Sequence, residues 1–287
     1  MKSGLKETRG MYAMKSAARW LVVVIAILCV LGGGFLYRYR VEEESRVGAE
    51  IQTIVTAETF SHTLFDQVLQ AYVDEQGRVD YAALKQNPQQ LEAYLDAIAV
   101  ISPNELPTGR AALASWINAY NALTIKGVLD HYPTTSVRKI KPYLSFFSRI
   151  KFRVGNQDYT LNDIEHGIIR GEFAEPRIHF ALVCASGGCP ILQNRAYLPE
   201  TLDEQLENAT SGFINNPEKV RLDRENRVLY LSKIFEWYTV DFEQTHDSLL
   251  DFVMAYRPET DAVFLKNEDV HVQYLPYDWE LNDQKQK

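Results

Sequence analysis

The chain has 287 residues, 46% of them hydrophobic and 24% charged, and its formal net charge is −8 at pH 7. The excess of acidic residues lies downstream of residue 40, which argues against nucleic acid as a partner. This downstream region is long enough to form one large hydrophobic core.

The first predicted element is a membrane helix at residues 20–37, WLVVVIAILCVLGGGFLY, a segment without any charge. Its length is close to what a helix needs to cross a bilayer. Basic residues gather before it and acidic residues follow soon after it, so the N-terminus is expected in the cytoplasm. Because no small-residue cleavage site follows the apolar run, an uncleaved anchor is favoured over a signal peptide. We therefore predict a single-pass protein of the bacterial inner membrane with its C-terminal domain in the periplasm.

The membrane helix divides the chain into five predicted segments. They are a cytoplasmic N-terminus at 1–19, the transmembrane helix at 20–37, a stalk at 38–57, a single exported domain at 58–281 and a polar tail at 282–287. Apolar residues recur at helical spacing within 64–72, 88–101 and 107–132, so the first half of the domain is predicted to be helical.

The second half of the domain changes to strand patterns. Residues 151–161 and 220–231 each predict a hairpin, and a helix is expected after each one. Residues 178–183 predict a further strand, and residues 201–214 another helix. Helices first and hairpins later, without alternation of the two, indicate an α+β domain. The predicted architecture is a set of N-terminal helices packed on an antiparallel sheet built from hairpins, preceded by one transmembrane helix.

Five segments of the domain resemble the DUF547 family, which is named for its unknown function. They are VDY at 79–81, WINAYNALTI at 116–125, YTLNDIEHGIIR at 159–170, HFALVCASGGCP at 179–190 and IFEWYTVDF at 234–242. The resemblance covers about residues 64–245. It implies relatives among bacterial exported or membrane-tethered proteins and among plant proteins that carry a coiled coil. It also implies, by analogy of fold, a relationship to papain-like or transglutaminase-like proteins.

Two cysteines at the end of the predicted strand 178–183 are the candidate nucleophiles. Cys184 directly follows the strand, and a thiol on a tight turn after a rigid strand is well placed to attack a bound substrate. Cys189 follows Gly187 and Gly188, whose bare backbone would let N–H groups approach an oxyanion. We therefore predict Cys184 as the nucleophile and the turn from Gly187 to Cys189 as a source of oxyanion donors.

The candidate base is His166, which stands beside Glu165 in a helical segment. His179 is nearer in the sequence, but strand alternation would place it on the opposite face from Cys184. We keep His179 as a substrate-binding candidate. The sequence thus predicts that His166 accepts the proton of Cys184 and that Glu165 orients His166.

Asn118 and Asn121 are three residues apart on one predicted helix, so both could reach a common point. An Asn that bonds a histidine ring is known from papain-like sites, so Asn121 is a candidate orienting residue and Asn118 a substrate-binding one. Because both precede the cysteines in the chain, such a site would be permuted. The alternative is that these Asn and His residues are buried polar groups that satisfy neighbouring backbone.

The predicted function is a cysteine-dependent hydrolase or acyl transferase with an amide, peptide or cell-wall substrate. The alternative is a non-catalytic binding or scaffold module with a structural Cys184–Cys189 disulfide, which an oxidising periplasm would favour. No metal site is predicted, because the two cysteines lack C-x2-C spacing and a second pair. No cofactor is predicted either, since the sequence holds no phosphate-binding or dinucleotide-binding glycine motif.

Overall fold

The computed structural model describes residues 60–101, 109–140 and 145–285. The predicted membrane helix at 20–37 lies outside these residues, as do the predicted cytoplasmic segment at 1–19 and the predicted stalk at 38–57. Within the described ranges no helix is both long and apolar enough to cross a bilayer. The transmembrane helix of the predicted fold class is therefore not an element of the fold that the structure describes.

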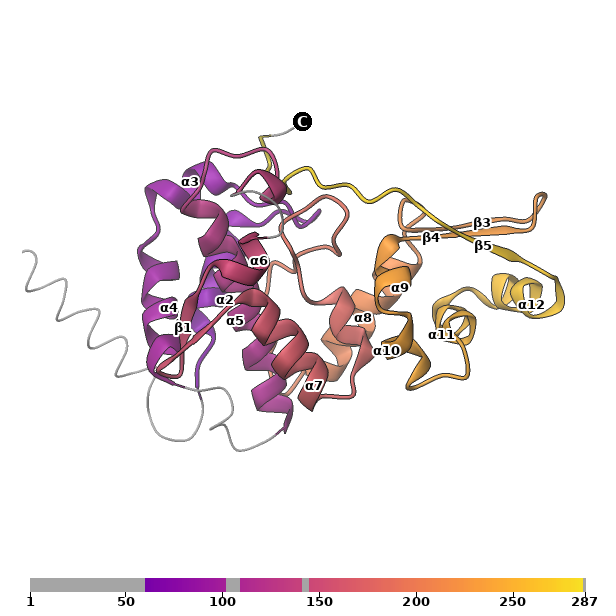
Figure 1. Ribbon diagram of the computed structural model, residues 1–287, viewed down its shortest axis with the longest axis horizontal. Helices are drawn as coiled ribbons and strands as arrows, with labels where there is room; N and C mark the ends of the chain where they lie inside the picture. The colour runs from indigo at the N-terminus through magenta and orange to yellow at the C-terminus, as the bar shows by residue number, and fades with distance from the viewer. Residues whose placement is uncertain (1–59, 102–108, 141–144, 286–287) are drawn as a thin grey trace, which may run out of the picture. The chain divides into compact units, whose positions relative to one another are not determined.

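Four helices form the first half of the described fold, and they lie together in Figure 1. They are α2 (Thr63–Tyr72), α3 (Tyr81–Gln86), α4 (Gln89–Val100) and α5 (Gly109–Leu129). α5 is rich in alanine, a strong helix former, and nearly all of its side chains are buried. α3 and α4 pack against α5, and α2 packs against α4. The helices predicted in this half are confirmed, with α5 at their centre.

Short helical elements lead from this bundle to the second half. They are the 3-10 helix η2 (Val137–Lys139), α6 (Ser145–Arg149), the π-helix η3 (Asp163–Ile169), α7 (Arg170–Glu172) and the 3-10 helix η4 (Pro176–Phe180). η3 packs against α5. A π-helical turn is uncommon and is found frequently at functional sites. This one carries Glu165 and His166, two of the predicted site residues.

The second half has its own aromatic core. Its helices are α8 (Leu202–Ile214), α9 (Lys233–Trp237), α10 (Thr239–Glu243), α11 (Leu249–Tyr256) and α12 (Glu259–Asn267). Phe180 at the end of η4 lies among their rings, with its centroid 5.0 Å from that of Phe213 and 5.7 Å from that of Phe242. The chain just upstream of Cys184 is therefore anchored in this core.

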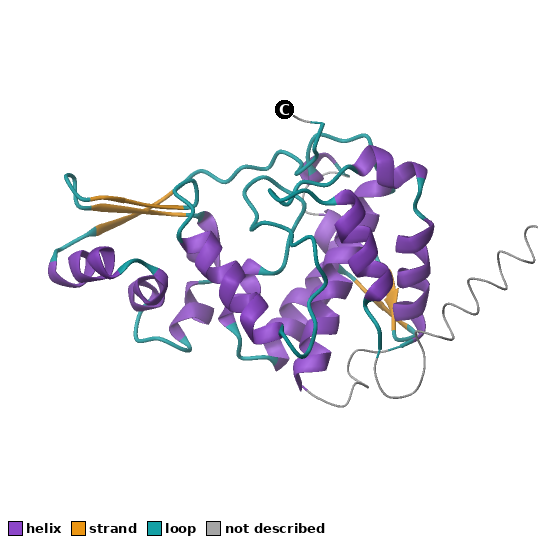
Figure 2. Cartoon of the chain, turned by 180° about the vertical axis from the view of Figure 1, so that it is seen from behind, coloured by secondary structure: helices purple, strands orange, loops and turns teal. Residues whose placement is uncertain are grey.

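The strands form two small sheets in separate places (Figure 2). β1 (Phe152–Val154) and β2 (Gln157–Tyr159) make an antiparallel hairpin whose turn residues Gly155 and Asn156 both have positive φ. β3 (Val220–Asp223) pairs antiparallel with β4 (Val228–Leu231), and β5 (His271–Tyr274) pairs parallel with β4. Both predicted hairpins are confirmed.

The predicted fold class is nevertheless wrong. The hairpins do not join into one antiparallel sheet under the N-terminal helices, and one of the two sheets contains a parallel pair. The fold is mixed, with helices that pack mainly on one another and two small sheets beside them. β5 was not anticipated because its side chains are mostly exposed and carry no strong strand pattern.

The predicted strand at 178–183 is also wrong, since residues 176–180 form the 3-10 helix η4. Pro176 stands in the first turn of η4, where its fixed φ suits a helix and its missing N–H costs nothing. The side chain of Glu175 caps the same turn by accepting from the N–H of Arg177. The apolar residues Ile178 and Phe180 are buried as a strand would bury them, so burial alone did not distinguish the two structures.

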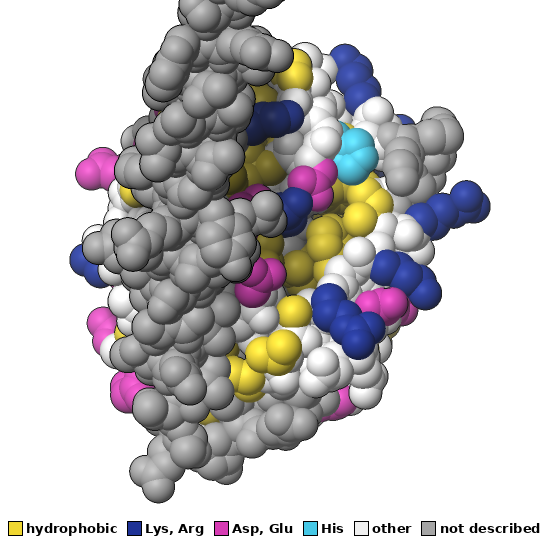
Figure 3. Space-filling view, turned by 90° about the vertical axis from the view of Figure 1, so that its left-hand side faces the viewer, with side chains coloured by type: hydrophobic (Ala, Val, Ile, Leu, Met, Phe, Trp, Pro, Cys, Tyr) yellow, Lys and Arg dark blue, Asp and Glu magenta, His cyan; other side chains and the backbone are white. Residues whose placement is uncertain are grey.

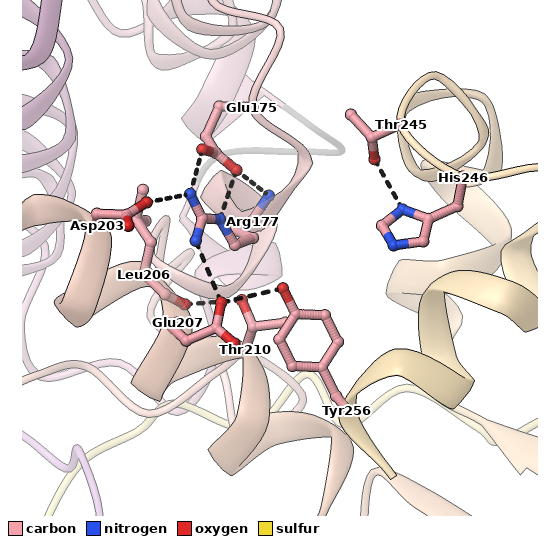
Figure 4. A network of polar contacts seen from close by, with 9 residues as sticks. All are labelled: Glu175, Arg177, Asp203, Leu206, Glu207, Thr210, Thr245, His246 and Tyr256. Carbon is pink, nitrogen blue, oxygen red and sulfur yellow. Dashed lines mark hydrogen bonds and ion pairs between the residues drawn. The ribbon is translucent and has the colours of Figure 1, made fainter. Parts of the chain in front are cut away.

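Arg177 fastens η4 to α8 through a network of charged contacts shown in Figure 4. Its guanidinium lies 2.7 Å from carboxylate oxygens of both Glu175 and Asp203, and 3.2 Å from Glu207. Glu207 also accepts from the hydroxyl of Tyr256 on α11. These hydrogen bonds, first of all that to Glu175, raise the pKa of Arg177 further above its already high value. Three helical elements are thus held together next to the segment that leads to Cys184.

The chain returns from β5 to the first half as an extended segment, residues 275–285, which we term the C-terminal strap (Figure 1). Asn282 accepts from the hydroxyl of Tyr81 at 2.9 Å, and its carbonyl accepts from the N–H of Val79. Asn282 and Asp283, at the start of the predicted polar tail, are buried. The strap therefore belongs to the folded unit.

The face seen in Figure 3 mixes side-chain types wherever described residues are visible. Lys and Arg side chains stand among Asp and Glu side chains, with hydrophobic side chains between them. On this visible portion of the surface, neither sign of charge forms a continuous patch of the kind that attracts a polyanion.

Candidate functional site

A cavity of about 270 Å³ brings together three of the predicted site residues. Cys184, Glu165 and His166 line it. The rest of its wall is strongly aromatic and includes Tyr120, Trp237, Tyr238 and Trp279. A concave site with an aromatic wall and a few convergent polar groups is the usual form of a small-molecule or peptide site.

Asn121 fixes the position of Cys184 through the backbone just before it. Its side-chain amide donates to the carbonyl of Ala181 at 2.9 Å and accepts from the N–H of Val183 at 3.0 Å. Asn121 is almost fully buried on α5, so these two bonds form in a water-excluded environment. Asn121 does not bond a histidine ring as predicted, but it positions the loop that carries the thiol.

Asn118 lies about one helical turn before Asn121 and supports a different loop in the same way. Its side chain donates to the carbonyl of Tyr197 at 2.7 Å and accepts from the N–H of the same residue at 2.9 Å. It does not line the cavity. The alternative interpretation of both Asn residues, as buried groups that satisfy loop backbone, matches these contacts.

Four side chains form one hydrogen-bonded group, which we term the thiol cluster: Cys184, Ser186, Cys189 and Tyr277. The hydroxyl of Ser186 lies 3.1 Å from the sulfur of Cys184 and 3.3 Å from that of Cys189. The hydroxyl of Tyr277 lies 3.3 Å from each sulfur. Ser186 donates to the oxygen of Tyr277 at 3.1 Å, which leaves the phenol proton directed at a sulfur. Both cysteines are free thiols in this structure.

The two sulfurs of the cluster have opposite acidities. The sulfur of Cys189 accepts the N–H of Cys184 at 3.0 Å. Burial opposes ionisation of Cys189, but the hydrogen bonds that its sulfur receives, first of all from Cys184, outweigh it and lower its pKa. The hydrogen bond to Cys189, together with burial, raises the pKa of Cys184 well above its ordinary value. Cys189 is therefore the thiol of the pair that ionises first, and Cys184 is the one that keeps its proton.

The glycines of the predicted oxyanion turn serve the C-terminal strap instead. The N–H of Gly187 donates to the carbonyl of Glu280 and that of Gly188 to the carbonyl of Asp278, both at 2.8 Å. A Cβ at Gly188 would lie 2.7 Å from the ring of Tyr277. The N–H of Cys189 donates to the carbonyl of Ser186 at 3.0 Å. All three predicted oxyanion donors are thus engaged within the protein, and the glycines are needed for the close approach of the strap.

His166 meets Arg170 rather than Glu165. A guanidinium N–H of Arg170 lies 2.7 Å from Nδ1 of His166, and an arginine only donates. Nδ1 is therefore the acceptor, and Nε2 carries the proton of the neutral ring. In this arrangement His166 offers the cavity a hydrogen-bond donor, and the predicted role as base toward Cys184 does not follow from the geometry.

Glu165 is held by two tyrosines of the cavity wall. Its two carboxylate oxygens accept from the hydroxyls of Tyr120 at 2.9 Å and Tyr238 at 2.5 Å. Burial, followed by the nearby charge of Glu165, raises the pKa of both phenols, so both stay protonated as donors. The carboxylate is the acidic group of the cavity, fixed in place by its neighbours.

A partly buried ionic network lies behind the cavity wall. Asp241 accepts from Arg170 through both oxygens, at 2.6 and 2.8 Å, and from Nε2 of His179 at 2.7 Å. Although burial opposes ionisation, the hydrogen bonds from His179 and Arg170 hold the pKa of Asp241 far below its usual range. His179 is buried, which lowers its pKa, and its ring stacks on that of Tyr238 at 3.8 Å. His179 does not line the cavity, and it supports Tyr238 from behind.

Several functional residues escaped the sequence prediction. Tyr120 and Tyr238 stand inside the family-like segments but look like ordinary core aromatics there. Tyr277 and Trp279 lie beyond those segments, in a strap without helix or strand pattern. Their proximity to Cys184 depends on tertiary contacts, and no spacing along the chain could have revealed it.

Within the described ranges the structure holds no group of three or more His, Cys, Asp or Glu side chains arranged to bind a metal ion.

Comparison with known families identifies the segment around this site. Residues 104–214 match the family model described as "Protein of unknown function, DUF547". The chain carries a DUF547 domain. The matched segment includes α5 with both Asn residues, η3 with Glu165 and His166, and the loop with both cysteines. No curated protein and no solved structure matches the chain. The family resemblance of the sequence is thus confirmed over this segment.

Proposed function

We propose that the DUF547 domain is a cysteine-dependent catalyst of acyl transfer, a hydrolase or acyl transferase, with Cys184 as its nucleophile. One observation carries the proposal. Cys184 lines the aromatic cavity while its sulfur belongs to a cluster in which a second thiol, Cys189, has a lowered pKa. A thiolate and a thiol in one network supply both a nucleophile and a proton acceptor, which cysteine catalysis requires.

The proposed reaction starts with a substrate carbonyl in the cavity. As the sulfur of Cys184 bonds to the carbonyl carbon, its proton passes to the thiolate of Cys189. The tetrahedral intermediate then expels an amine or alcohol, which takes a proton back from Cys189, and an acyl thioester remains on Cys184. Water or another acceptor attacks this thioester and regenerates the thiol. Every proton in this sequence stays within the thiol cluster or leaves with a product.

His166 and Glu165 are assigned to substrate binding in this proposal. The Nε2 proton of His166 is suited to donate to the carbonyl oxygen as charge develops on it. Glu165 is suited to accept from an N–H group of an amide or peptide-like substrate. The aromatic walls favour a flat or apolar substituent next to the scissile bond.

An activated ester tests the proposal without knowledge of the natural substrate. The chain has a third cysteine, Cys29, so the experiment uses a Cys29→Ser background. We expect p-nitrophenyl acetate to give a burst of one nitrophenolate per protein and an acetyl group on Cys184, located by peptide mass spectrometry. Cys184→Ser removes the burst, and Cys189→Ser slows it on the order of 10- to 100-fold, as loss of a general base does.

Two results would overturn the proposal. One is acetylation that persists in Cys184→Ser at the wild-type rate, and the other is a folded wild type that never acylates. The second result would favour the non-catalytic binding module, with the aromatic cavity as its ligand site.

A further inference from the structure

The thiol cluster separates two cavities of the protein. Cys184 lines the aromatic cavity already described, and Cys189 lines a second cavity of about 340 Å³. The second cavity also includes Lys219, Gly187 and Asp278. Each cysteine therefore lines a different cavity, although both sulfurs lie within hydrogen-bond distance of the hydroxyls of Ser186 and Tyr277.

The two sulfurs are unbonded neighbours with little between them. Ser186 and Tyr277 each lie within hydrogen-bond distance of both. The four residues between Cys184 and Cys189 are Ala, Ser, Gly and Gly, so no bulky side chain separates them. The two sulfurs are therefore near neighbours, as formation of a disulfide requires.

We propose that Cys184 and Cys189 form a dithiol–disulfide couple that exchanges with low-molecular-weight disulfides entering the aromatic cavity. This activity goes beyond acyl transfer and does not depend on it, because the electrophile is a sulfur atom and not a carbonyl carbon. The couple assigns Cys189 a role of its own, as the thiol that resolves a mixed disulfide.

The exchange takes place in two displacement steps. Cys184 passes its proton to the thiolate of Cys189 and attacks one sulfur of a disulfide R–S–S–R, whose S–S bond breaks and releases one RS⁻. This RS⁻ takes up the proton from Cys189, whose thiolate then attacks the sulfur of the Cys184 mixed disulfide and releases the second RS⁻. The protein has lost two electrons, and the substrate has become two thiols, one protonated by the cysteine pair and the other by water. An external dithiol reverses both steps.

The burial of the two thiols assigns their order. Cys184 is half-buried at the wall of the aromatic cavity, whereas only 5% of Cys189 is exposed. The more accessible sulfur meets the incoming disulfide, and the buried one attacks from within. The ammonium of Lys219, held 2.6 Å from the carbonyl of Gly187, brings a positive charge close to Cys189 and favours its thiolate.

Oxidised glutathione is the probe, again in the Cys29→Ser background. We expect the reduced protein to lose the mass of two hydrogens, with Cys184 and Cys189 joined in one disulfide, and dithiothreitol to restore it. Two results would overturn the proposal. One is stable addition of glutathione to both cysteines. The other is a protein that does not react under conditions in which a cysteine in an unstructured control peptide does. The readout is mass, so a failure here and a failure of acyl transfer are separate results.

Single-thiol variants separate the two steps. Cys189→Ala should stop after the first step and accumulate one glutathione on Cys184, with release of the second thiol slowed on the order of 100-fold or more. Cys184→Ala should react with glutathione far more slowly than wild type. Thermal melts of both variants confirm folding. If folded Cys189→Ala still releases both glutathione molecules at the wild-type rate, Cys189 is not the resolving thiol.

Discussion

The phenol oxygen of Tyr277 lies 3.3 Å from the sulfur of Cys184, although 93 residues separate them in the chain. Tyr277 belongs to the C-terminal strap. The loop that carries Cys184 binds this strap because the N–H groups of Gly187 and Gly188 donate to strap carbonyl groups. The thiol cluster is therefore assembled from two distant segments of the chain. A substitution that removes the Tyr277 hydroxyl, or that displaces the strap from Gly187 and Gly188, should therefore change the reactivity of the thiols.

Replacement of Tyr277 by Phe should slow alkylation of Cys184 at pH 7 by roughly three- to tenfold. The change removes a hydroxyl that lies within hydrogen-bond distance of both sulfurs and can donate its proton to either one. Its loss raises the pKa at which the pair loses its first proton. The measurement is the rate of labelling with iodoacetamide in the Cys29→Ser background. Tyr197→Phe is the matched control, because the buried hydroxyl of Tyr197 has no hydrogen-bond partner among the described residues. An equal effect of both variants would refute the role of Tyr277.

Asn121→Ala should destabilise the protein by about 2–4 kcal/mol and also disturb the thiol, because it leaves the buried N–H of Val183 and carbonyl of Ala181 without partners. Asn118→Ala removes the same pair of bonds from Tyr197 and should cost a similar amount. Urea titration compares the stabilities of the two variants, and alkylation kinetics compare their thiols. Only the Asn121 variant should alter the labelling of Cys184, and unchanged labelling in that variant would contradict the positioning role.

Gly188→Ala should destabilise the protein by about 2 kcal/mol or more. The new Cβ would lie 2.7 Å from the ring of Tyr277 and 2.8 Å from the carbonyl of Asp278, so the strap must move. Gly212→Ala in α8 is the control, since no atom lies within 4 Å of its new Cβ. It should stabilise the helix by about 0.5–1 kcal/mol. Thermal denaturation of both variants checks the opposite signs.

Stability should fall as the pH is lowered from about 6.5 to about 4, because burial lowers the pKa of His62 from 6.5 to about 4. In this window the unfolded chain binds a proton at His62 and the folded protein does not, so protons favour unfolding. The loss attributable to His62 is at most about 3–4 kcal/mol. Burial also lowers the pKa of His179, so protonation of His179 destabilises the folded protein in the same direction.

The variant His62→Gln isolates this contribution. It gives up the bonds of the ring to Tyr94 and Ser115, so it should be less stable at pH 7. Its stability should nonetheless change less than that of wild type between pH 6.5 and 4 in chemical denaturation. Parallel pH profiles for the two proteins would rule out the assignment to His62.

The helices of the first half could be predicted from the sequence because their information is local. α2, α4 and α5 follow apolar spacing within single segments, and the two hairpins follow alternation around turn residues. η4 was not predicted because the alternation of Ile178 and Phe180 is typical of a buried strand. Pro176 and the cap from Glu175 instead favour a 3-10 helix at this place. The parallel strand β5 depends on a partner that lies far away in the sequence.

Three residues of the candidate site were named from the sequence, but the aromatic residues around them and most of their contacts were not. Cys184, Glu165 and His166, which were chosen from the sequence for their chemistry, line one cavity. Their hydrogen-bond partners were not predicted. Arg170, four residues further along the chain, donates to His166, and two tyrosines from distant segments donate to Glu165. Carbonyl groups of the C-terminal strap accept from the N–H groups of Gly187 and Gly188. The strand alternation used to separate His179 from Cys184 rested on a strand that does not form, although His179 does lie outside the cavity.

The rate of iodoacetamide labelling of Cys184 as a function of pH, in the Cys29→Ser protein, tests the central claim most directly. The pair loses its first proton mainly from Cys189, and exchange of the remaining proton leaves a fraction of Cys184 as thiolate. Labelling of Cys184 should therefore show its first midpoint at the ionisation of the pair, below the ordinary thiol value of about 8.5. The same profile for Cys189→Ser should move toward that ordinary value. A wild-type midpoint at or above about 8.5, or modification confined to Cys189, would contradict the account.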